Sequence, residues 1–167
     1  MSSRIFAFLA SVMLPIACSG QKVDNSPVSS FIPDNYLGNW FEIARFDHSF
    51  ERGVQFATAR YSLTGVGRIK VINSGVKDGK QKTSVGKAKV THTPGRLRVS
   101  FFGPFYSDYI VMMLDENYSY ALVGSKSDKY LWILSRTPSL PESTLNAILT
   151  EARSRGYDTG KLTFVQH

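Results

Sequence analysis

Leu37-Gly38-Asn39-Trp40-Phe41-Glu42-Ile43-Ala44-Arg45 is the stretch that decides the fold. Gly38 stands two residues before Trp40, and a glycine there predicts a backbone bend that carries the indole into a core, where only a missing side chain leaves room. Along the strand that follows, alternation places Glu42 and Ala44 on the same face as Trp40. A carboxyl and a small side chain on that face predict a barrel with a partly hollow interior, closed at the end where Trp40 lies.

Short turn signals divide the rest of the chain into strands. They include Asn73-Ser74-Gly75, Asp78-Gly79 and Gly103-Pro104, and the runs between them are rich in Val, Ile, Thr, Tyr and Phe. With the strand at Trp40, the expected strands are 54–63, 68–73, 84–90, 97–102, 109–114, 119–124 and 130–136. Eight antiparallel strands joined by consecutive hairpins predict an all-β, up-and-down barrel. A β-sandwich is the alternative, and the lack of a long crossover disfavours it.

One helix interrupts this pattern near the C-terminus. Ser139-Leu140-Pro141-Glu142 has the form of a capping box, and Gly156 supplies the stop. The helix carries an apolar stripe formed by Leu145, Ile148, Leu149 and Ala152. We expect this stripe to pack on the outer wall of the barrel, after which residues 162–165 add an edge strand.

The composition limits the class of protein. The chain has 167 residues, of which 43% are hydrophobic and 13% aromatic, which is enough for one domain with a sizeable core and excludes a disordered chain. The net charge is +7, but the basic residues are scattered and form no long run. A solvated exterior is therefore favoured over a nucleic-acid face, and we predict no nucleic-acid partner. A mild attraction to anionic lipid headgroups is compatible with this charge.

The N-terminus has the pattern of an export signal. Arg4 precedes an apolar run, 5–16, that is too short to span a bilayer but long enough for a secretory signal peptide. Cys18, the single cysteine of the chain, follows directly after this segment. We predict a signal peptide over residues 1–17, a lipidated polar tether over 18–30 and the barrel domain over 31–167.

The segment Leu14-Pro15-Ile16-Ala17-Cys18-Ser19 resembles the cleavage site of bacterial lipoproteins. The resemblance implies that Cys18 becomes the new N-terminus and carries several acyl chains, which together give stable anchoring. Ser19 after the cysteine implies the outer membrane, on its periplasmic side. An incidental cysteine in a signal peptide is the alternative.

Three motifs resemble the lipocalin family in order and spacing: Gly38-X-Trp40, the turn Asp115-Glu116-Asn117-Tyr118, and Arg136 at the end of the last strand. The match covers residues 31–165. Within the family, three segments resemble the bacterial outer-membrane lipocalins related to apolipoprotein D; they are 40–47, 101–106 and 130–138. The resemblance implies an eight-stranded barrel with one helix outside. It also implies that the Arg136 guanidinium packs across the Trp40 indole at the closed end, as a structural and not a catalytic contact.

Period two along the strands, together with this alignment, gives the residues expected to face the interior and bind a ligand. They are Glu42, Ala44, Ala121, Val123, Tyr130, Trp132 and Leu134. Trp132 is the strongest candidate, because a second indole facing inward has space above it only if the barrel holds a cavity. For Leu134 and Val123, ordinary barrel core is an equal alternative. Glu42 would need a polar partner or water in this apolar setting.

An enzyme is not predicted. The three histidines, His48, His92 and His167, are far apart without metal-ligand spacing, and we expect them at the surface. Outside Cys18 there is no thiol, and no Gly-X-Ser-X-Gly motif is present. We expect no metal and no cofactor. A haem or pigment carrier is disfavoured because no axial His or Cys is suitably placed.

Two functions remain. The first is a membrane-anchored protein that stores or transports a fatty acid or lysophospholipid in the cell envelope. The second is a surface lipoprotein whose filled barrel serves protein interaction or structural support. The aromatic run Phe101-Phe102-Gly103-Pro104-Phe105 is either a plug between strands or a contact with a membrane or partner. Two copies could pair through an outer strand as a homodimer.

Overall fold

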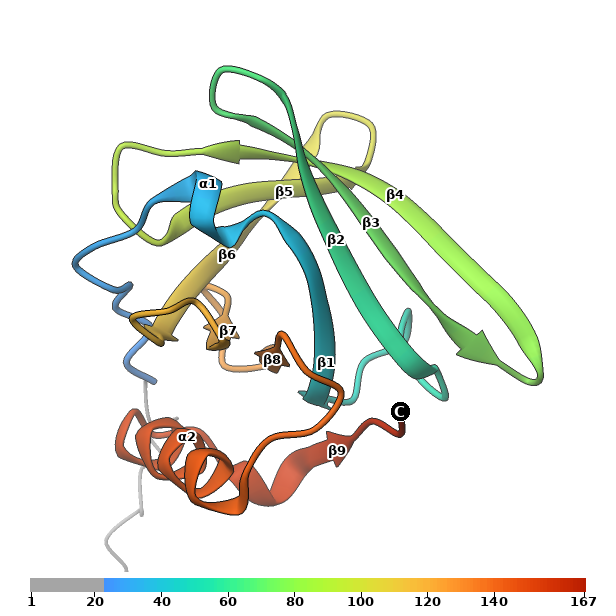
Figure 1. The fold of residues 1–167 in the computed structure, drawn as a ribbon, viewed down its shortest axis with the longest axis vertical. Coiled ribbons are helices and arrows are strands. Elements are labelled where there is room, and N and C mark those ends of the chain that lie inside the picture. Colours follow the sequence, from blue (N-terminus) through green and yellow to red (C-terminus); the bar gives the residue numbers. More distant parts are fainter. Residues whose placement is uncertain (1–22) are drawn as a thin grey trace, which may run out of the picture.

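A computed structural model describes residues 23–167, and most of them form one closed barrel (Figure 1). Its strands are β1 (Gly38–Phe46), β2 (Gln55–Gly65), β3 (Arg68–Lys77), β4 (Lys80–Val90), β5 (Arg96–Phe102), β6 (Phe105–Leu114), β7 (Tyr120–Gly124) and β8 (Leu131–Ser135). Each strand is antiparallel to the next, and β1 pairs with both β2 and β8. This pairing closes the sheet, so the predicted eight-stranded up-and-down barrel is confirmed.

The remaining elements lie at the barrel's end and on its outer wall. A single helical turn, α1 (Pro33–Tyr36), precedes β1. After β8 come α2 (Glu142–Ser154), the 3₁₀ turn η1 (Thr159–Lys161) and β9 (Leu162–Phe164), which pairs with the last residues of β1. The predicted outer helix and edge strand are therefore confirmed (Figure 1).

The predicted capping box at the start of α2 is wrong. The N-cap residue is Pro141, and no side chain caps the helix there. A proline disfavours helical backbone at the residue before it, so Leu140 stays outside the helix. Ser139 consequently lies too far upstream to cap, and its carbonyl oxygen instead accepts a hydrogen bond from the Thr137 hydroxyl at 2.7 Å.

The predicted turn at Asn73-Ser74-Gly75 is also wrong, because β3 continues through it to Lys77. The hairpin turns instead at Asp78-Gly79, and β4 begins at Lys80. Gly75 lies against the Val54 side chain and the Gln55 carbonyl, where a Cβ atom would have no room. This glycine therefore marks a close approach of two chain segments and not a turn.

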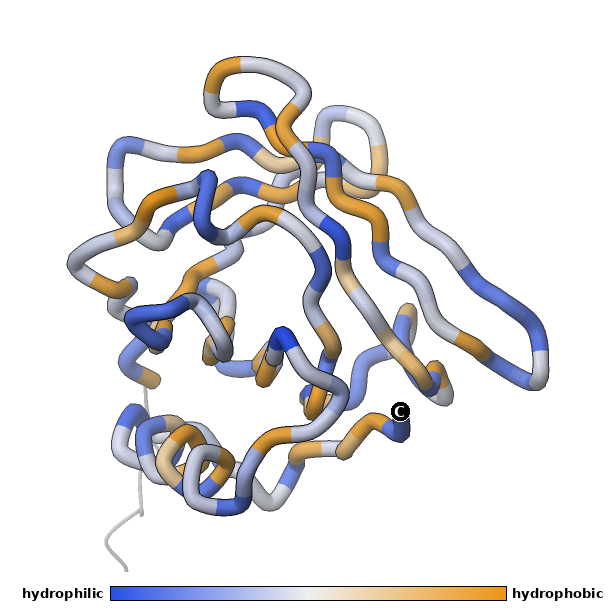
Figure 2. The backbone as a smooth tube through the Cα atoms, viewed as in Figure 1, coloured by the Kyte–Doolittle hydropathy of each residue, from blue (hydrophilic) through white to orange (hydrophobic). Residues whose placement is uncertain are grey.

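Two hydrophobic cores share the β-sheet. Figure 2 shows apolar and polar residues alternating along the strands, as expected of a sheet with two distinct faces. The buried residues of the barrel interior include Tyr36, Trp40, Tyr61, Ile69, Val71, Ala88, Leu97, Val111, Ala121, Val123 and Leu134. The second core lies between the wall and α2 and includes Ile43, Ala44, Phe46, Ile110, Met112, Leu122, Leu131, Ile133, Ile148 and Ala152.

A β-bulge in β1 reverses one of the predicted orientations. Glu42 pairs with Leu134, whereas Ala44 pairs with Ile133, so Ile43 is an extra residue on the β1 side. Leu134 belongs to the interior core and Ile133 to the core beneath α2. Ala44 therefore faces α2, and the prediction that it faces the interior is wrong. Beyond the bulge, Arg45 takes the inward position that simple alternation assigned to Ala44.

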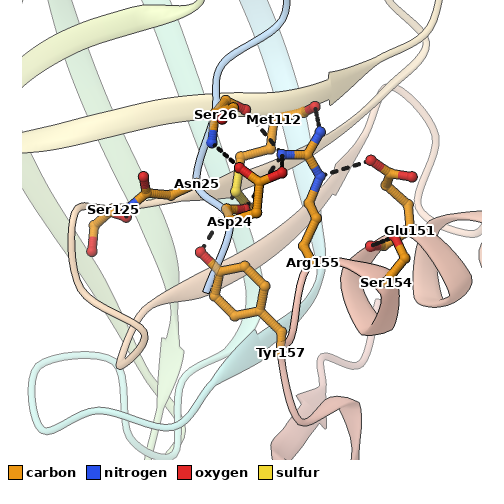
Figure 3. Close-up of polar contacts among 9 residues, drawn as sticks. All are labelled: Asp24, Asn25, Ser26, Met112, Ser125, Glu151, Ser154, Arg155 and Tyr157. Carbon is orange, nitrogen blue, oxygen red and sulfur yellow. Dashed lines mark hydrogen bonds and ion pairs between the residues drawn. The ribbon is translucent and has the colours of Figure 1, made fainter. Parts of the chain in front are cut away.

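The segment before α1 is bound to the barrel wall, although its polar composition predicts a loose tether. The Asp24 amide donates to the Arg155 carbonyl at 2.8 Å, and the Val28 amide donates to the Val111 carbonyl at 2.9 Å. Figure 3 shows the Arg155 guanidinium between this segment and β6. From Val23 on, this segment is thus packed on the wall, while Cys18 and the predicted signal peptide 1–17 lie outside the described residues. Within residues 23–167, no helix is long and apolar enough to cross a membrane.

Candidate functional site

The closed end of the barrel is built around Trp40. Gly38 has a φ of +96°, which a residue with a side chain rarely adopts, and this bend turns the Trp40 ring inward. The indole nitrogen donates to the Tyr36 carbonyl at 2.9 Å, and the Arg136 guanidinium carbon lies 3.9 Å from the centre of the ring. The guanidinium also donates to three carbonyl oxygens, those of Asn35, Asn39 and Tyr118. The predicted stacking of Arg136 on Trp40 is confirmed.

Three buried tyrosines meet inside the barrel close to Trp40. The Tyr109 hydroxyl lies 2.7 Å from that of Tyr36 and 3.0 Å from that of Tyr61, and the Tyr36 ring is 4.8 Å from the Trp40 ring. Burial raises the pKa of Tyr61 to about 12 and raises the pKa values of Tyr36 and Tyr109 well above the usual tyrosine value, so all three hydroxyls stay neutral. Sequence reasoning missed this cluster, because its members come from α1, β2 and β6 and no motif connects them.

Five of the residues predicted to bind a ligand lie together on the interior face. Ala121, Val123 and Leu134 are buried there, Trp132 is half-buried against them, and Glu42 lies opposite Leu134. Tyr130, in the β7–β8 connection, stacks on Trp132 with the ring planes 11° apart and their centres 5.8 Å apart. These residues extend from the level of Trp40 to the open end. Their contact with a ligand stays a prediction.

A buried arginine is the partner of Glu42. The Arg45 guanidinium, 1% exposed, donates to the Glu42 carboxyl at 2.6 Å and to the carbonyl oxygens of Glu51 and Val54 at 2.7 and 2.9 Å. This answers the expectation that a carboxyl inside the barrel needs a polar partner. Sequence reasoning missed Arg45, because strict alternation placed it on the outer face.

The carboxyl of Glu42 is held largely protonated near neutral pH. Burial raises its pKa to about 8, and the nearby Glu51 carboxylate acts in the same direction, while Arg45 opposes both. Glu42 can thus remain inside the barrel without a full negative charge. The interior at this level is polar but close to charge balance, with Arg45 facing Glu42 and Glu51.

The mouth of the barrel carries an aromatic cluster around Glu51. The Trp132 indole nitrogen donates to the Glu51 carboxylate at 3.1 Å, and His48 Nε2 lies 2.8 Å from the same oxygen. The His48 ring is 3.9 Å from the Phe50 ring and 5.5 Å from the Tyr130 ring. His48 is 8% exposed, so the expectation of a surface histidine is wrong here, whereas His92 and His167 are exposed. The β1–β2 connection therefore folds over the rim and contacts both predicted aromatic residues.

Two hollows lie outside this region. The larger, of about 410 Å³, is lined by Thr64, Arg68, Ile69, Lys87, Ala88, Lys89 and Tyr106, and the smaller, of about 70 Å³, by Val23, Phe46, Asp128, Gly156, Tyr157, Asp158 and Lys161. None of the residues predicted to bind a ligand lines either one. Among residues 23–167, no three His, Cys, Asp or Glu side chains are grouped so that they could hold a metal ion.

Comparison with known proteins agrees with this architecture. A family model described as a lipocalin-like domain matches residues 33–167. Outer membrane lipoprotein Blc of Vibrio cholerae is 47% identical, with 97% of each chain covered, and Outer membrane lipoprotein Blc of Escherichia coli K12 is 44% identical, covering 97% of this chain and 95% of the relative. Insecticyanin from the tobacco hornworm Manduca sexta has the same fold, with a TM-score of 0.71 at 23% identity over 84% of this chain and 83% of that one.

Proposed function

The chain belongs to the lipocalin family, and from that premise we propose that it is an outer-membrane lipoprotein that binds a fatty acid or lysophospholipid in its barrel and stores or transports it in the cell envelope. One observation carries the proposal. A mainly apolar interior surface, interrupted by the polar groups of Glu42 and Arg45, extends from the stacked pair Tyr130 and Trp132 at the mouth to Trp40 at the closed end. A hydrocarbon chain is the ligand that suits such a surface. The proposed role is binding and not catalysis.

The proposed contacts follow the depth of the barrel. Tyr130 and Trp132 offer flat aromatic surface to the first part of an acyl chain, and Val123, Leu134 and Ala121 line its deeper part. Burial contributes roughly 0.8 kcal/mol per CH₂, so ten enclosed methylenes give about 8 kcal/mol, which corresponds to micromolar affinity. Glu42 and Arg45 supply the polar groups at the level of Trp132, where a carboxyl or ester of the ligand would lie.

The direct test is lipid analysis of the protein purified without detergent exchange. We expect mass spectrometry of the extract to find fatty acid or lysophospholipid at near-stoichiometric amounts, and the lipid to displace a fluorescent fatty acid. Trp132→Leu should weaken that displacement about tenfold through lost aromatic contact. Ile133→Val, at the neighbouring residue that faces α2, is the matched control and should leave it unchanged. An empty barrel that binds no fluorescent fatty acid would contradict the proposal.

Anchoring through Cys18 is a separate part of the proposal. It rests on the resemblance of residues 14–19 to a lipoprotein cleavage site and on the similarity to bacterial relatives named as outer membrane lipoproteins. Radiolabelled palmitate should enter the wild-type protein and not Cys18→Ser. If the wild type takes up no label while a control lipoprotein does, anchoring is refuted. The proposed lipid binding inside the barrel is not affected by that result. Pairing of two copies through an outer strand stays a prediction.

The second candidate function, a filled barrel that serves as an interaction module, also has an observation in its favour. Ala121 and Val123 are fully buried by the protein itself, and the two hollows lie elsewhere. A barrel packed by its own side chains would look the same. A bulky substitution in the interior, Ala121→Phe, separates the two functions.

A further inference from the structure

The three most exposed aromatic side chains of residues 23–167 lie at the open end of the barrel. Phe50, in the β1–β2 connection, is 64% exposed, and Phe102 and Phe105, which face each other across the β5–β6 turn, are 79% and 78% exposed. Exposed phenylalanines at this density are unusual on a surface that meets only water. Neither the barrel core nor the proposed binding of a lipid inside it uses the side chains of Phe102 and Phe105.

The N-terminal segment reaches the barrel at the same end. Val23 lies in the hollow lined by Phe46, the last residue of β1, and Asp128 in the β7–β8 connection, both of which are at the open end. Two residues further on, the Asn25 side chain donates to the Ser125 carbonyl at 3.2 Å. The chain then runs along the wall toward the closed end, where the Ile32 amide donates to the Tyr118 hydroxyl at 2.8 Å just before α1 begins.

Arg155 holds the N-terminal segment in place on the barrel wall. Its guanidinium donates to the carbonyl oxygens of Ser26 and Met112 at 3.0 and 2.9 Å and pairs with the Glu151 carboxylate at 2.7 Å (Figure 3). Because the arginine bonds to the segment and to β6 together, the segment cannot swing away from the wall without breaking charged hydrogen bonds. The distance to the anchor is therefore counted from Val23, where the described residues begin.

That length is short compared with the barrel. Cys18 precedes Val23 by five residues, which span at most about 17 Å when fully extended. The nine residues of β1 cover about 30 Å along the strand, or about 23 Å along the barrel axis at an ordinary tilt. A membrane that holds Cys18 is thus within reach of the open end, whereas with the closed end on the membrane the link would be too short.

Two of the four connections at the open end carry a charge that suits an anionic lipid surface. The β3–β4 hairpin and the β7–β8 connection carry five lysines, Lys77, Lys80, Lys82, Lys126 and Lys129, against two aspartates, Asp78 and Asp128. Among the described residues none of these lysines forms an ion pair within 4.0 Å. A lysine near an anionic bilayer gains about 1 kcal/mol.

We propose that the open end docks on the bilayer that anchors the chain, with Phe50, Phe102 and Phe105 in the headgroup region and the lysines of the two neighbouring loops on anionic lipids. This rests on the proposed anchoring at Cys18. In that orientation the mouth formed by Tyr130 and Trp132 faces the membrane, so a lipid passes between bilayer and barrel without crossing water.

The test uses the full-length acylated protein in vesicles of phosphatidylethanolamine and phosphatidylglycerol. Acylation consumes Cys18, so Phe105→Cys and Val66→Cys each offer one thiol for an environment-sensitive fluorophore. Val66, at the β2–β3 turn of the closed end, is fully exposed and is the matched control. We expect nitroxide-labelled lipids to quench the label at position 105 at least about threefold more strongly than the label at 66. Equal quenching, or stronger quenching at 66, would overturn the proposal.

A second arm separates the docking surface from the anchor and from lipid carriage. In the protein with Cys18→Ser, we measure the fraction that floats with the same vesicles. This fraction should fall several-fold when Phe102→Ser and Phe105→Ser are combined, and also when phosphatidylcholine replaces phosphatidylglycerol. Val66→Ser should leave it unchanged. Flotation that is unaffected by the phenylalanine changes would refute the surface. If the protein contains lipid but its label at 66 is the more strongly quenched one, docking through the open end is refuted. The proposed lipid binding is then still supported.

Discussion

Two arginines hold opposite ends of the barrel, and each does so through a different kind of contact. Arg136 covers the Trp40 ring from outside the interior and ties three carbonyl oxygens of the closing segments together. Arg45 is buried inside, where its charge faces Glu42 and the carbonyl of Glu51. The planar guanidinium suits both places, because it stacks on a ring and donates in several directions.

Arg136→Ala tests the structural role of the closed end. Loss of the stacking and of three charged hydrogen bonds at a partly exposed site should cost about 2 kcal/mol and lower the melting temperature by roughly 5 °C. Arg136→Lys keeps the positive charge but not the planar guanidinium, so its melting temperature should lie between those of the wild type and Arg136→Ala. Lipid binding by the fraction that remains folded should be unchanged, as measured by displacement of a fluorescent fatty acid. A normal melting temperature with lost binding would refute this role.

Glu42→Gln tests the buried carboxyl through pH. The folded pKa of about 8 lies above the ordinary value of 4.5, so the folded protein keeps a proton that the unfolded chain releases. The stability contributed by this group is complete below about pH 4.5 and is lost as pH rises through 8. Relative to the variant, the wild type should lose a few kcal/mol of unfolding free energy between pH 5 and pH 8.5.

Urea unfolding at both pH values measures this difference. The amide of the variant still accepts the Arg45 hydrogen bond, so the comparison isolates the titration. Glu116→Gln, at an exposed carboxyl in the turn after β6, is the control and should follow the wild type. Parallel pH profiles for Glu42→Gln and the wild type would show that the Glu42 pKa is not raised.

At the scale of elements, the bulge in β1 determines which of its residues face the barrel interior and which face α2. Before it, Trp40 and Glu42 face inward; after it, Arg45 does, and Ile43 and Ala44 pack beneath α2. The extra residue thus lets one strand serve both cores. It also bends the strand toward β9, which pairs with the part of β1 after the bulge.

Ala44→Phe and Ala121→Phe form a matched pair, because both alanines are fully buried but in different cores. Ala44→Phe should push α2 off the wall and destabilise the domain by roughly 1 to 3 kcal/mol. Ala121→Phe should fill interior space, leave the melting temperature near the wild-type value and abolish lipid displacement. Equal destabilisation by both would indicate a filled interior and favour the interaction module over the carrier.

The elements differ in how far the sequence predicts them, for physical reasons. The closed end could be predicted from Gly38 and Trp40, because a glycine two residues before a tryptophan is a local sequence signal. Alternation predicted the inward direction of Trp132 and Leu134, whereas the resemblance to lipocalins predicted that of Val123. Alternation fails at a bulge, which inserts a residue without changing composition, so Ala44 and Arg45 were exchanged. The tyrosine cluster and the burial of His48 depend on contacts between distant segments and have no local signature.

At the scale of the whole molecule, the segment before α1, the wall and α2 form one unit held by Arg155. The arginine leaves the end of α2, reaches β6 through the Met112 carbonyl and reaches the segment through Ser26. The same unit sets where the chain toward Cys18 leaves the barrel. The proposed orientation of the barrel on a membrane therefore depends on α2 and β6, which hold the segment, as well as on the exposed residues of the open end.

Arg155→Gln should free this segment. Charged hydrogen bonds contribute about 1.5 to 3 kcal/mol each, so their loss should speed hydrogen exchange of the Val28 amide by at least about tenfold, while amides of β2 and β3 keep their protection. Arg153→Gln, at the exposed arginine of the same helical turn, is the control. With the segment free, the link from Cys18 lengthens and the difference in quenching between labels at 105 and 66 should shrink. Unchanged exchange at Val28 would mean that Arg155 does not hold the segment, and an unchanged quenching difference despite faster exchange would mean that the rim alone orients the barrel.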